Sequence, residues 1–228
     1  MIINKRLKEV GELVEDNSSF LDIGCDHAFL DIYLAGDKTK KFKKIVASDN
    51  KEGPLEHAKN NVKQHKLTDK IELRLGNGLD IYTSDINTIV ISGMGGRSII
   101  GILKSHEEYL KTIDTLILSP NNYQIDVRSY LTKKGYYIDE EVLVKDGKYI
   151  YQIMRFKRGK KKYSKKEIFF GPILLTKKDT NFRLLYDREL KTREIILQLL
   201  PKGFSLRKRK LKKEIELILE ELKSMSNK

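Results

Sequence analysis

Residues 20–35, FLDIGCDHAFLDIYLA, place a short apolar strand before a glycine-containing turn and an apolar helix. Such a turn opens many nucleotide-binding α/β folds, where further glycines let the backbone approach a pyrophosphate. Here those later positions hold Asp26, His27 and Phe29. The carboxylates of Asp22 and Asp26 would repel a pyrophosphate and attract an ammonium or sulfonium group. The loop is therefore predicted to bind a zwitterionic, cationic ligand, with Gly24 allowing a close backbone approach.

Apolar runs that end in polar or glycine-containing turns recur through the first 156 residues. They are SFLDIGC, KIVASDN, IELRLGNG, TIVISGMGG and TLILSPN. Segments with helical spacing of apolar residues, at 51–67, 97–112 and 125–135, lie between them. This alternation predicts parallel strands joined by right-handed crossovers, with the ligand site at the carboxyl ends of the strands.

Two further strands, YYIDEEVLV and YIYQIMRF, are separated by KDGK, and Asp-Gly favours a hairpin turn. A mostly parallel sheet that ends in an antiparallel hairpin matches Rossmann-like class I methyltransferases, which use S-adenosylmethionine, better than NAD dehydrogenases. The analogy is at the level of the fold. The predicted fold class is thus an α/β methyltransferase sheet at residues 1–156, followed by a smaller domain.

The smaller domain, residues 157–228, is predicted to be a helical hairpin. One helix is expected from about residue 168 to 200, a turn at Pro201-Lys202-Gly203, and a second helix from about 205 to 224. In the second helix apolar residues recur at alternating steps of four and three, which predicts an antiparallel coiled coil. The residues of this seam are Leu211, Ile215, Ile218, Leu222 and Met225.

The excess positive charge of the chain lies entirely in this domain. Residues 157–228 hold 22 Lys and Arg against 9 Asp and Glu, whereas residues 1–156 hold 23 of each kind. A basic domain beside a neutral one favours a polyanionic partner, although a solubilising helical hairpin is the alternative interpretation. The predicted RNA-binding residues are Lys160, Lys161, Lys162, Arg207, Lys208, Arg209 and Lys210, with Arg6 before the first strand.

Polar residues at the other predicted strand ends extend the ligand site. Asp49, 27 residues after Asp22, is placed to accept hydrogen bonds from ribose hydroxyls, or alternatively to cap the next helix. Asn50 and Asn77 offer amides to an adenine ring. The candidate cofactor-binding residues are Asp22, Gly24, Cys25, Asp26, Asp49, Asn50, Asn77, Gly78, Ser92 and Gly93.

The fourth predicted strand ends in ISGMGG, residues 91–96, and the fifth in SPNN, residues 119–122. Methyltransferases that act on exocyclic amines usually carry Asp/Asn-Pro-Pro-aromatic at the end of the fourth strand. Neither the acid nor the prolines are present here. Three glycines in four positions instead predict a backbone that lies close to both ligands, although a flexible turn is the alternative.

The segments DIGCDHAFL, SDN followed by GPLEHAKNNV, GNGL, ISGMGG and SPN resemble, in this order, the TrmK family of bacterial tRNA (adenine-22, N1)-methyltransferases. The resemblance continues through FFGPILL into the helical hairpin. Cys25 and Phe29 stand where the family pattern has Ser and Tyr. The resemblance implies methyl transfer from S-adenosylmethionine to N1 of adenine 22 in the D-arm of tRNA. The candidates around the target base are Asp26, His27, Phe29, Ser92, Met94 and Asn121.

Several classes of function are disfavoured or left as alternatives. Cys25 is the single cysteine, and the four histidines have no metal-ligand spacing, so neither a disulfide nor a metal is expected. A cytoplasmic monomer without a signal peptide or a membrane span is expected. A methyltransferase of another RNA base or of a protein, an RNA-binding protein with a vestigial cofactor site, and an NAD-linked dehydrogenase remain alternatives.

Overall fold

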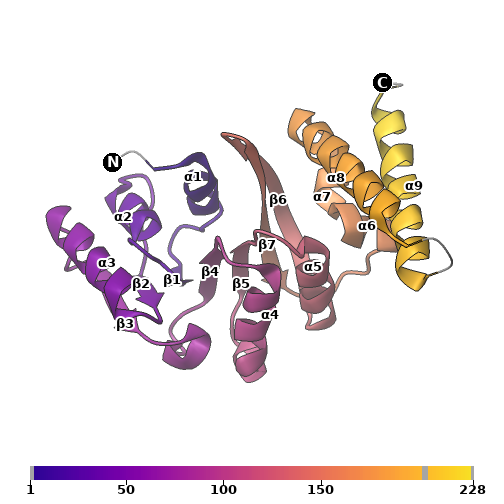
Figure 1. The fold of residues 1–228 in the computed structure, drawn as a ribbon. Helices are drawn as coiled ribbons and strands as arrows, with labels where there is room; N and C mark the ends of the chain where they lie inside the picture. The colour runs from indigo at the N-terminus through magenta and orange to yellow at the C-terminus, as the bar shows by residue number, and fades with distance from the viewer. Residues whose placement is uncertain (1–2, 202–204, 227–228) are drawn as a thin grey trace. The chain divides into compact units, whose positions relative to one another are not determined.

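A seven-stranded sheet forms the centre of the first part of the chain (Figure 1). The computed structural model describes residues 3–201 and 205–226, so part of the predicted turn at Pro201-Lys202-Gly203 lies outside the described residues. The chain divides into unit 1, up to Tyr163, and unit 2, from Ser164. The predicted division after Phe156 is too early, because strand β7 continues to Arg158 and the Tyr163 hydroxyl accepts a hydrogen bond from the backbone of β6.

The elements of unit 1 alternate between strands and helices. The strands are β1 (Ser19–Ile23), β2 (Lys44–Asp49), β3 (Ile71–Leu75), β4 (Thr88–Ser92), β5 (Thr115–Ser119), β6 (Tyr136–Asp146) and β7 (Tyr149–Arg158). The helices are α1 (Lys5–Glu12), α2 (Phe29–Gly36), α3 (Glu52–Gln64), α4 (Gly96–Ser105) and α5 (Gln124–Lys133), with 3-10 helices η1 (Gly78–Ile81) and η2 (Glu107–Lys111). The helix predicted over 97–112 is therefore α4 followed by η2, because the extended φ of −139° at His106 ends α4.

The strand order is β3-β2-β1-β4-β5-β7-β6. Strands β1 to β5 are parallel, and β7 is antiparallel to both of its neighbours. This is the predicted mostly parallel sheet with a terminal antiparallel hairpin. The chain moves outward from β1 to β2 and β3, then returns to β4 beside β1. Right-handed crossovers therefore put α2 and α3 on one face and α4 and α5 on the other, and ligands bind where the direction reverses.

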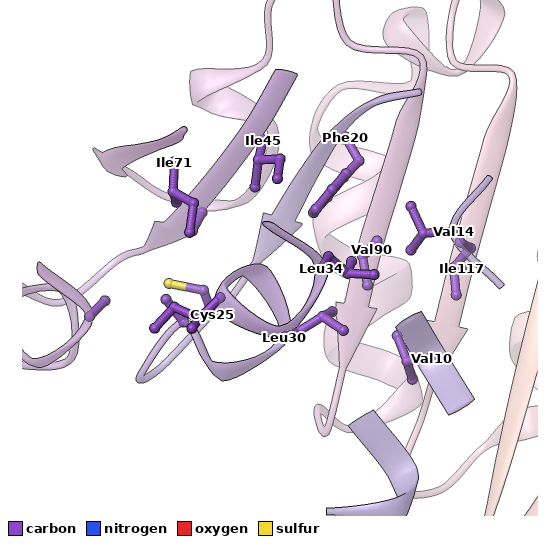
Figure 2. Packing of buried hydrophobic residues seen from close by; sticks show 14 of the residues in the cluster. Val10, Val14, Phe20, Cys25, Leu30, Leu34, Ile45, Ile71, Val90 and Ile117 are labelled. Atoms are coloured by element: carbon purple, nitrogen blue, oxygen red, sulfur yellow. The ribbon is translucent and has the colours of Figure 1, made fainter. Parts of the chain in front are cut away.

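The hydrophobic core beneath α1 and α2 holds the strands of this switch point in place. Every residue of β1 and β5 is buried, as expected for central parallel strands covered on both faces. Figure 2 shows Leu30 and Leu34 of α2 and Val10 of α1 among the buried side chains that also include Phe20 and Ile117. The carboxyl ends of β1 and β4 therefore rest on rigid, packed elements.

A buried polar network fixes α5 to the terminal hairpin. Arg128 of α5 is fully buried, and its Nε donates to Glu141 Oε1 of β6 at 2.7 Å. Its second terminal nitrogen donates to Gln152 Oε1 of β7 at 2.8 Å. A charge buried to this extent is tolerated only when it is paired and hydrogen-bonded, so this network ties three elements together.

Unit 2 contains four helices in its described residues: α6 (Lys165–Phe170), α7 (Pro172–Lys177), α8 (Thr180–Leu199) and α9 (Leu206–Ser226). The prediction of a single helix over residues 168–200 is wrong. Gly171, at φ +96°, ends α6, and Pro172 begins α7. Lys178 adopts a left-handed conformation, and the Asp179 side chain then caps α8 by accepting from Phe182 N at 2.8 Å.

Helices α8 and α9 are antiparallel. Arg193, near the end of α8, pairs with Glu214 near the start of α9, whereas Lys178, just before α8, bonds to Ser224 near the end of α9. Ile215, Ile218 and Leu222 are buried, and Leu211 and Met225 are half-buried, so the predicted seam faces the interior of unit 2. None of the described helices is long and apolar enough to cross a membrane.

Candidate functional site

The loops that follow β1 and β4 meet at the switch point of the sheet. Gly24 has φ +76°, and a Cβ atom at this position would lie 2.2 Å from Cε of Met94 in the β4 loop. Gly93 has φ +82°, again a conformation that favours glycine. The two predicted motifs, DIGC and ISGMGG, are thus in direct contact, and the absence of a side chain at Gly24 makes that contact possible.

The β1 loop is held in one conformation by β2. The backbone N–H groups of Gly24 and Cys25 both donate to Ser48 O, at 2.8 and 2.9 Å. Ser48 Oγ in turn donates to Asp22 O at 3.0 Å. Asp26, at φ +52°, completes the turn before α2. A loop fixed in this way presents a preformed surface, which lowers the entropic cost of binding a ligand.

Three carboxylates gather at the ends of β1 and β2, and Asp22, Asp31 and Asp49 are here named the acidic cluster. Asp22 is 5% exposed, and its burial raises the pKa of its carboxyl to about 7. Asp31, in the first turn of α2, is fully buried, and burial followed by the charge of Asp22 raises its pKa well above the ordinary range. Burial and the charges of all three aspartates also raise the pKa of the Cys25 thiol. A cationic ligand bound beside these carboxyls would lower their pKa values and favour their ionised forms, so the site is suited to such a ligand.

Asp49 has only one of its carboxylate oxygens engaged among the described residues. Its Oδ1 accepts a hydrogen bond from Lys51 N at 3.0 Å, in the turn before α3. The residue in the N-cap position of α3 is Lys51, so Asp49 shapes this turn without capping the helix itself. Asn50 and Asn77 are exposed beside it at the ends of β2 and β3. Gly78 is buried at φ +60°, with its α-carbon against Ile102 of α4.

The ends of β4 and β5 carry amides and hydroxyls. Asn121 Nδ2 donates to Gly93 O at 2.5 Å, and Asn121 N donates to Met94 O at 2.9 Å. The predicted site residue Asn121 therefore holds the β4 loop in place. The hydroxyls of Ser92 and Ser119, neighbours across β4 and β5, are buried and have no hydrogen-bond partner among the described residues. Buried polar groups of this kind are expected to find a partner in a ligand or in water.

The aromatic residues of the β1 loop stack on one another. The rings of His27 and Phe29 lie 5.2 Å apart at an interplanar angle of 22°, and His57 of α3 lies 5.3 Å from His27 on a tilted plane. Phe29 is 41% exposed, so one side of this stack is open. The Asp26 carboxylate lies 3.7 Å from His27 Nε2 and is largely exposed. These three predicted residues therefore lie together at the outer rim of the site.

Arg6 of α1 also reaches the site. A Cβ atom at Gly93 would lie 3.1 and 3.2 Å from its two terminal nitrogens, and its guanidinium lies 4.8 Å from the centre of the Tyr151 ring. The other predicted RNA-binding residues come from the segment after β7 and from unit 2. Lys160, Lys161 and Lys162 are exposed after β7, and Arg207, Lys208, Arg209 and Lys210 begin α9, all exposed apart from the half-buried Lys208.

Sequence reasoning missed several residues of the site. Asp31 carried a weak signal, because a lone acid in the apolar segment FLDIYLAG is unusual, but periodicity does not say which neighbour it meets. Asn122, whose Oδ1 accepts from Gly96 N at 3.1 Å, stood beside a predicted residue. Tyr123, at φ +55° and 42% exposed, stacks under Arg97 at 4.2 Å, a tertiary contact without a local signal. In the described part of the chain no three His, Cys, Asp or Glu side chains converge as metal ligands.

Comparison with known proteins agrees with this architecture. The family TrmK, tRNA (adenine(22)-N(1))-methyltransferase, matches residues 20–222. The tRNA (adenine(22)-N(1))-methyltransferase of Bacillus subtilis (strain 168) is 30% identical over 98% of this chain and 96% of its own length. The crystal structure of Streptococcus pneumoniae Sp1610 in complex with S-adenosyl-L-methionine superimposes with a TM-score of 0.88 at 33% identity, covering 97% of this chain and all of the other.

The structure of M. capricolum TrmK in complex with S-adenosyl-homocysteine is also similar, with a TM-score of 0.85 and 25% identity over 98% of this chain and 99% of the other. The seven-stranded order, the glycine-lined contact between the β1 and β4 loops, and the match over residues 20–222 agree with one another. The chain therefore belongs to the TrmK family of tRNA (adenine(22)-N(1))-methyltransferases.

Proposed function

We propose that this protein transfers the methyl group of S-adenosylmethionine to N1 of adenine 22 in the D-arm of tRNA. The observation that carries the proposal is the acidic cluster at the carboxyl ends of β1 and β2, next to the glycine-rich β4 loop. A cationic cofactor fits beside the cluster, and a substrate base fits over a loop that has few side chains. Family membership supplies the substrate.

The residues of the site fit this cofactor. S-adenosylmethionine supplies an electrophilic methyl group on a sulfonium centre. Asp22 and its loop face the amino-acid end of the cofactor, where negative charge attracts the ammonium group. The unengaged oxygen of Asp49 would accept from a ribose hydroxyl, and Asn50 and Asn77 would meet the adenine ring. The remaining predicted cofactor-binding residues would line the cofactor with backbone or small side chains; they are Gly24, Cys25, Gly78, Ser92 and Gly93.

The same charges argue against an NAD-linked reaction. A pyrophosphate is bound by backbone N–H groups at a helix N-terminus, without carboxylates nearby. Here Asp22 and Asp31 lie buried under the first loop, and Asp26 occupies the turn itself. A dinucleotide would have to bring two further negative charges into this environment.

The chemistry asks the protein mainly for alignment. Adenine N1 has a neutral lone pair, so no base is needed to expose it. The contribution of the site is to hold this nitrogen in line with the methyl group at near-attack distance. The open side of the His27–Phe29 stack would receive an adenine drawn out of its helix. The methylated base is cationic until it loses an N6 proton, and the exposed Asp26 carboxylate would stabilise that charge.

Ser92, Met94 and Asn121 would form the floor under the target base. Asn121 already fixes the Gly93 carbonyl, and Met94 closes against Gly24, so the floor is shaped before substrate arrives. The unpartnered Ser92 hydroxyl is available to a polar edge of the base or of the cofactor. The proposed roles are therefore positional and do not include covalent catalysis.

Unit 2 is proposed to bind the tRNA backbone. The start of α9 presents a run of four cations, Arg207, Lys208, Arg209 and Lys210. Among the described residues, Lys210 alone of the four pairs with an acid, at 3.9 Å from Glu214. Replacing Arg207, Arg209 and Lys210 by Gln should weaken tRNA binding and lower the slope of log affinity against log salt by about 2 to 3. Cofactor affinity should not change. An unchanged slope would mean that these residues do not contact tRNA phosphates and that their charge serves solubility.

The direct test of the function combines calorimetry with mapped methylation. Wild type should bind S-adenosylmethionine, and Asp49→Ala should bind it about 10- to 100-fold more weakly, because a hydrogen bond to a charged group is lost. A tRNA transcript with A22 should gain one methyl group at N1, and a transcript with G22 should gain none. Methylation at another position would support a different RNA substrate, and cofactor-independent tRNA binding without methylation would support the vestigial-site alternative.

A further inference from the structure

The β6–β7 hairpin extends well beyond the rest of the sheet. Strands β6 and β7 have 11 and 10 residues, whereas β5 has five. The last pair between β5 and β7 is Leu118 with Met154, so Ser119 lies level with Ile153 and residues 149–152 continue past it. At about 3.3 Å per residue this is an extension of about 13 Å. Because β6 is parallel to β5, the hairpin tip lies at the same edge of the sheet as the cofactor site, beside α1 (Figure 1).

One face of this extension carries aromatic residues that become progressively more exposed. Side chains alternate along a strand, so Ile153, Tyr151 and Tyr149 share a face. Ile153 is fully buried, Tyr151 is half-buried, and Tyr149 is 56% exposed. The two tyrosine rings lie 6.1 Å apart. The face therefore passes from the core of unit 1 to an open aromatic ring at the tip.

Arg6 connects this face to the site. Its guanidinium lies over the Tyr151 ring on one side and against Gly93 on the other. It forms no ion pair among residues 3–201 and 205–226, although it is half-buried. A cation in such a position is suited to an anionic ligand. Arg6, Tyr151 and Tyr149, here named the hairpin row, thus lead from the β4 loop outward to the tip.

The distribution of exposed aromatic residues points the same way. Among the described residues, the aromatic side chains with large exposed surface are Phe29, Tyr123 and Tyr149. They follow β1, β5 and β6 respectively, so all three lie at the carboxyl edge of the sheet. Lys148 lies with its ammonium group 5.3 Å from the Tyr149 ring, which adds positive charge at the tip. Exposed aromatic rings interleaved with cations are typical of surfaces that bind unpaired nucleotides.

We propose that the hairpin row is a second tRNA-binding site, which receives a nucleotide next to the target adenine. Tyr149 stacks on the base of that nucleotide, and Arg6 pairs with a neighbouring phosphate. The occupant is RNA and not a protein, because the face offers separate rings and a guanidinium without an ion pair among the described residues, where a protein-docking site would offer a continuous apolar patch. This inference rests on the proposed function, since it requires tRNA as the substrate.

Steady-state methylation of tRNA by full-length variants tests the proposal. Tyr149→Leu should raise KM for tRNA about tenfold, with kcat within about twofold, because base stacking is lost. Tyr149→Phe should match wild type, since it keeps the ring. Tyr137→Leu, the same change at the opposite end of the hairpin, is the control and should leave KM unchanged. Calorimetry should give one affinity for S-adenosylmethionine in all four proteins, and melting temperatures should report their folding.

Salt dependence separates the role of Arg6 from that of Tyr149. Arg6→Gln should lower the slope of log affinity for tRNA against log salt by about 1, whereas Tyr149→Leu should weaken binding without changing the slope. A wild-type KM in Tyr149→Leu, or an equal loss in Tyr149→Phe, would overturn the stacking role. Failure of the wild type itself to methylate tRNA would refute the proposed function, and is therefore distinguishable from failure of this inference.

Discussion

The buried pair of Asp22 and Asp31 predicts an unusual dependence of stability on pH. Neither oxygen of the Asp31 carboxyl accepts a hydrogen bond from the described residues, and the two carboxyls interact strongly. Two such groups in a low dielectric hold a proton that isolated aspartates release. For Asp22, burial raises the pKa from about 3.9 in an unfolded chain to about 7. The folded state therefore binds more protons than the unfolded state between these values.

The sign and size of the effect follow from this difference. The stabilisation from a raised carboxyl pKa is complete below about pH 4 and is lost as pH rises through about 7. For Asp22 the full loss is about 4 kcal/mol, of which about 2.5 kcal/mol falls between pH 5 and pH 8. His106, whose pKa is raised by Asp80 and Glu108, loses stabilisation in an overlapping range, but it does so equally in variants of the pair.

Urea unfolding at pH 5 and pH 8 measures this loss. Asp31→Asn removes one carboxyl and lets an amide donate to Asp22, so the drop in unfolding free energy should be less than half that of wild type. Asp126→Asn is a matched control. Like Asp31, Asp126 is the third residue of its helix, and each helix begins directly after a residue with a left-handed backbone, but Asp126 is exposed. The control should retain the full drop. An equal drop in Asp31→Asn and wild type would refute a proton shared by the pair.

Three further substitutions test the architecture. Gly24→Ala should lower the free energy of unfolding by only about 1–2 kcal/mol, because the backbone at this position is left-handed. Calorimetry should nevertheless find cofactor binding reduced at least tenfold, because the new methyl group displaces the Met94 side chain. Unimpaired binding would contradict the proposed site. Arg128→Met should lower the unfolding free energy of unit 1, measured in urea, by about 3–5 kcal/mol, and the double variant with Glu141→Leu should regain most of that stability. No recovery would mean that Arg128 stabilises unit 1 by packing and not by pairing with Glu141. Glu221→Gln should lower the melting temperature of unit 2, because Glu221 pairs with both Lys166 and Lys178. The control, Glu220→Gln, should leave the melting temperature unchanged.

The elements of unit 1 were predictable because their signals are local. The parallel strands are short, largely apolar runs, and each of the five ended at the turn that sequence reasoning placed there. The Asp-Gly pair at Asp146 fixed the hairpin and hence the class of sheet. The Gly171-Pro172 pair was an equally local signal that should have divided the predicted helix over residues 168–200. The left-handed Lys178 carried no such signal, because lysine, unlike glycine, does not mark a left-handed position in a sequence.

The site itself was only partly predictable, for a physical reason. Residues at strand ends, such as Asp22 and Asp49, are brought together by the topology, and topology followed from the alternation of elements. Asp31 and Arg6 reach the site from helices, and helical periodicity gives the face of a helix without giving the element that this face meets. The contacts of Arg6 with Gly93 and Tyr151 join residues far apart in the sequence, so no window of sequence contains them.

The charges of unit 1 are divided in a way that matches two ligands of opposite sign. A cationic cofactor requires negative potential, whereas an RNA substrate is repelled by it. The acidic cluster lies at the ends of β1 and β2 and is largely buried beneath the first loop, where solvent screens it little, so it acts most strongly on a ligand in that loop. Arg6 and Lys148 lie on the other side of the switch point, toward the β6–β7 hairpin. An arrangement of this kind lets one edge of the sheet attract both ligands. It predicts that a negative charge placed on the hairpin side, as in Arg6→Glu, would weaken tRNA binding far more than cofactor binding.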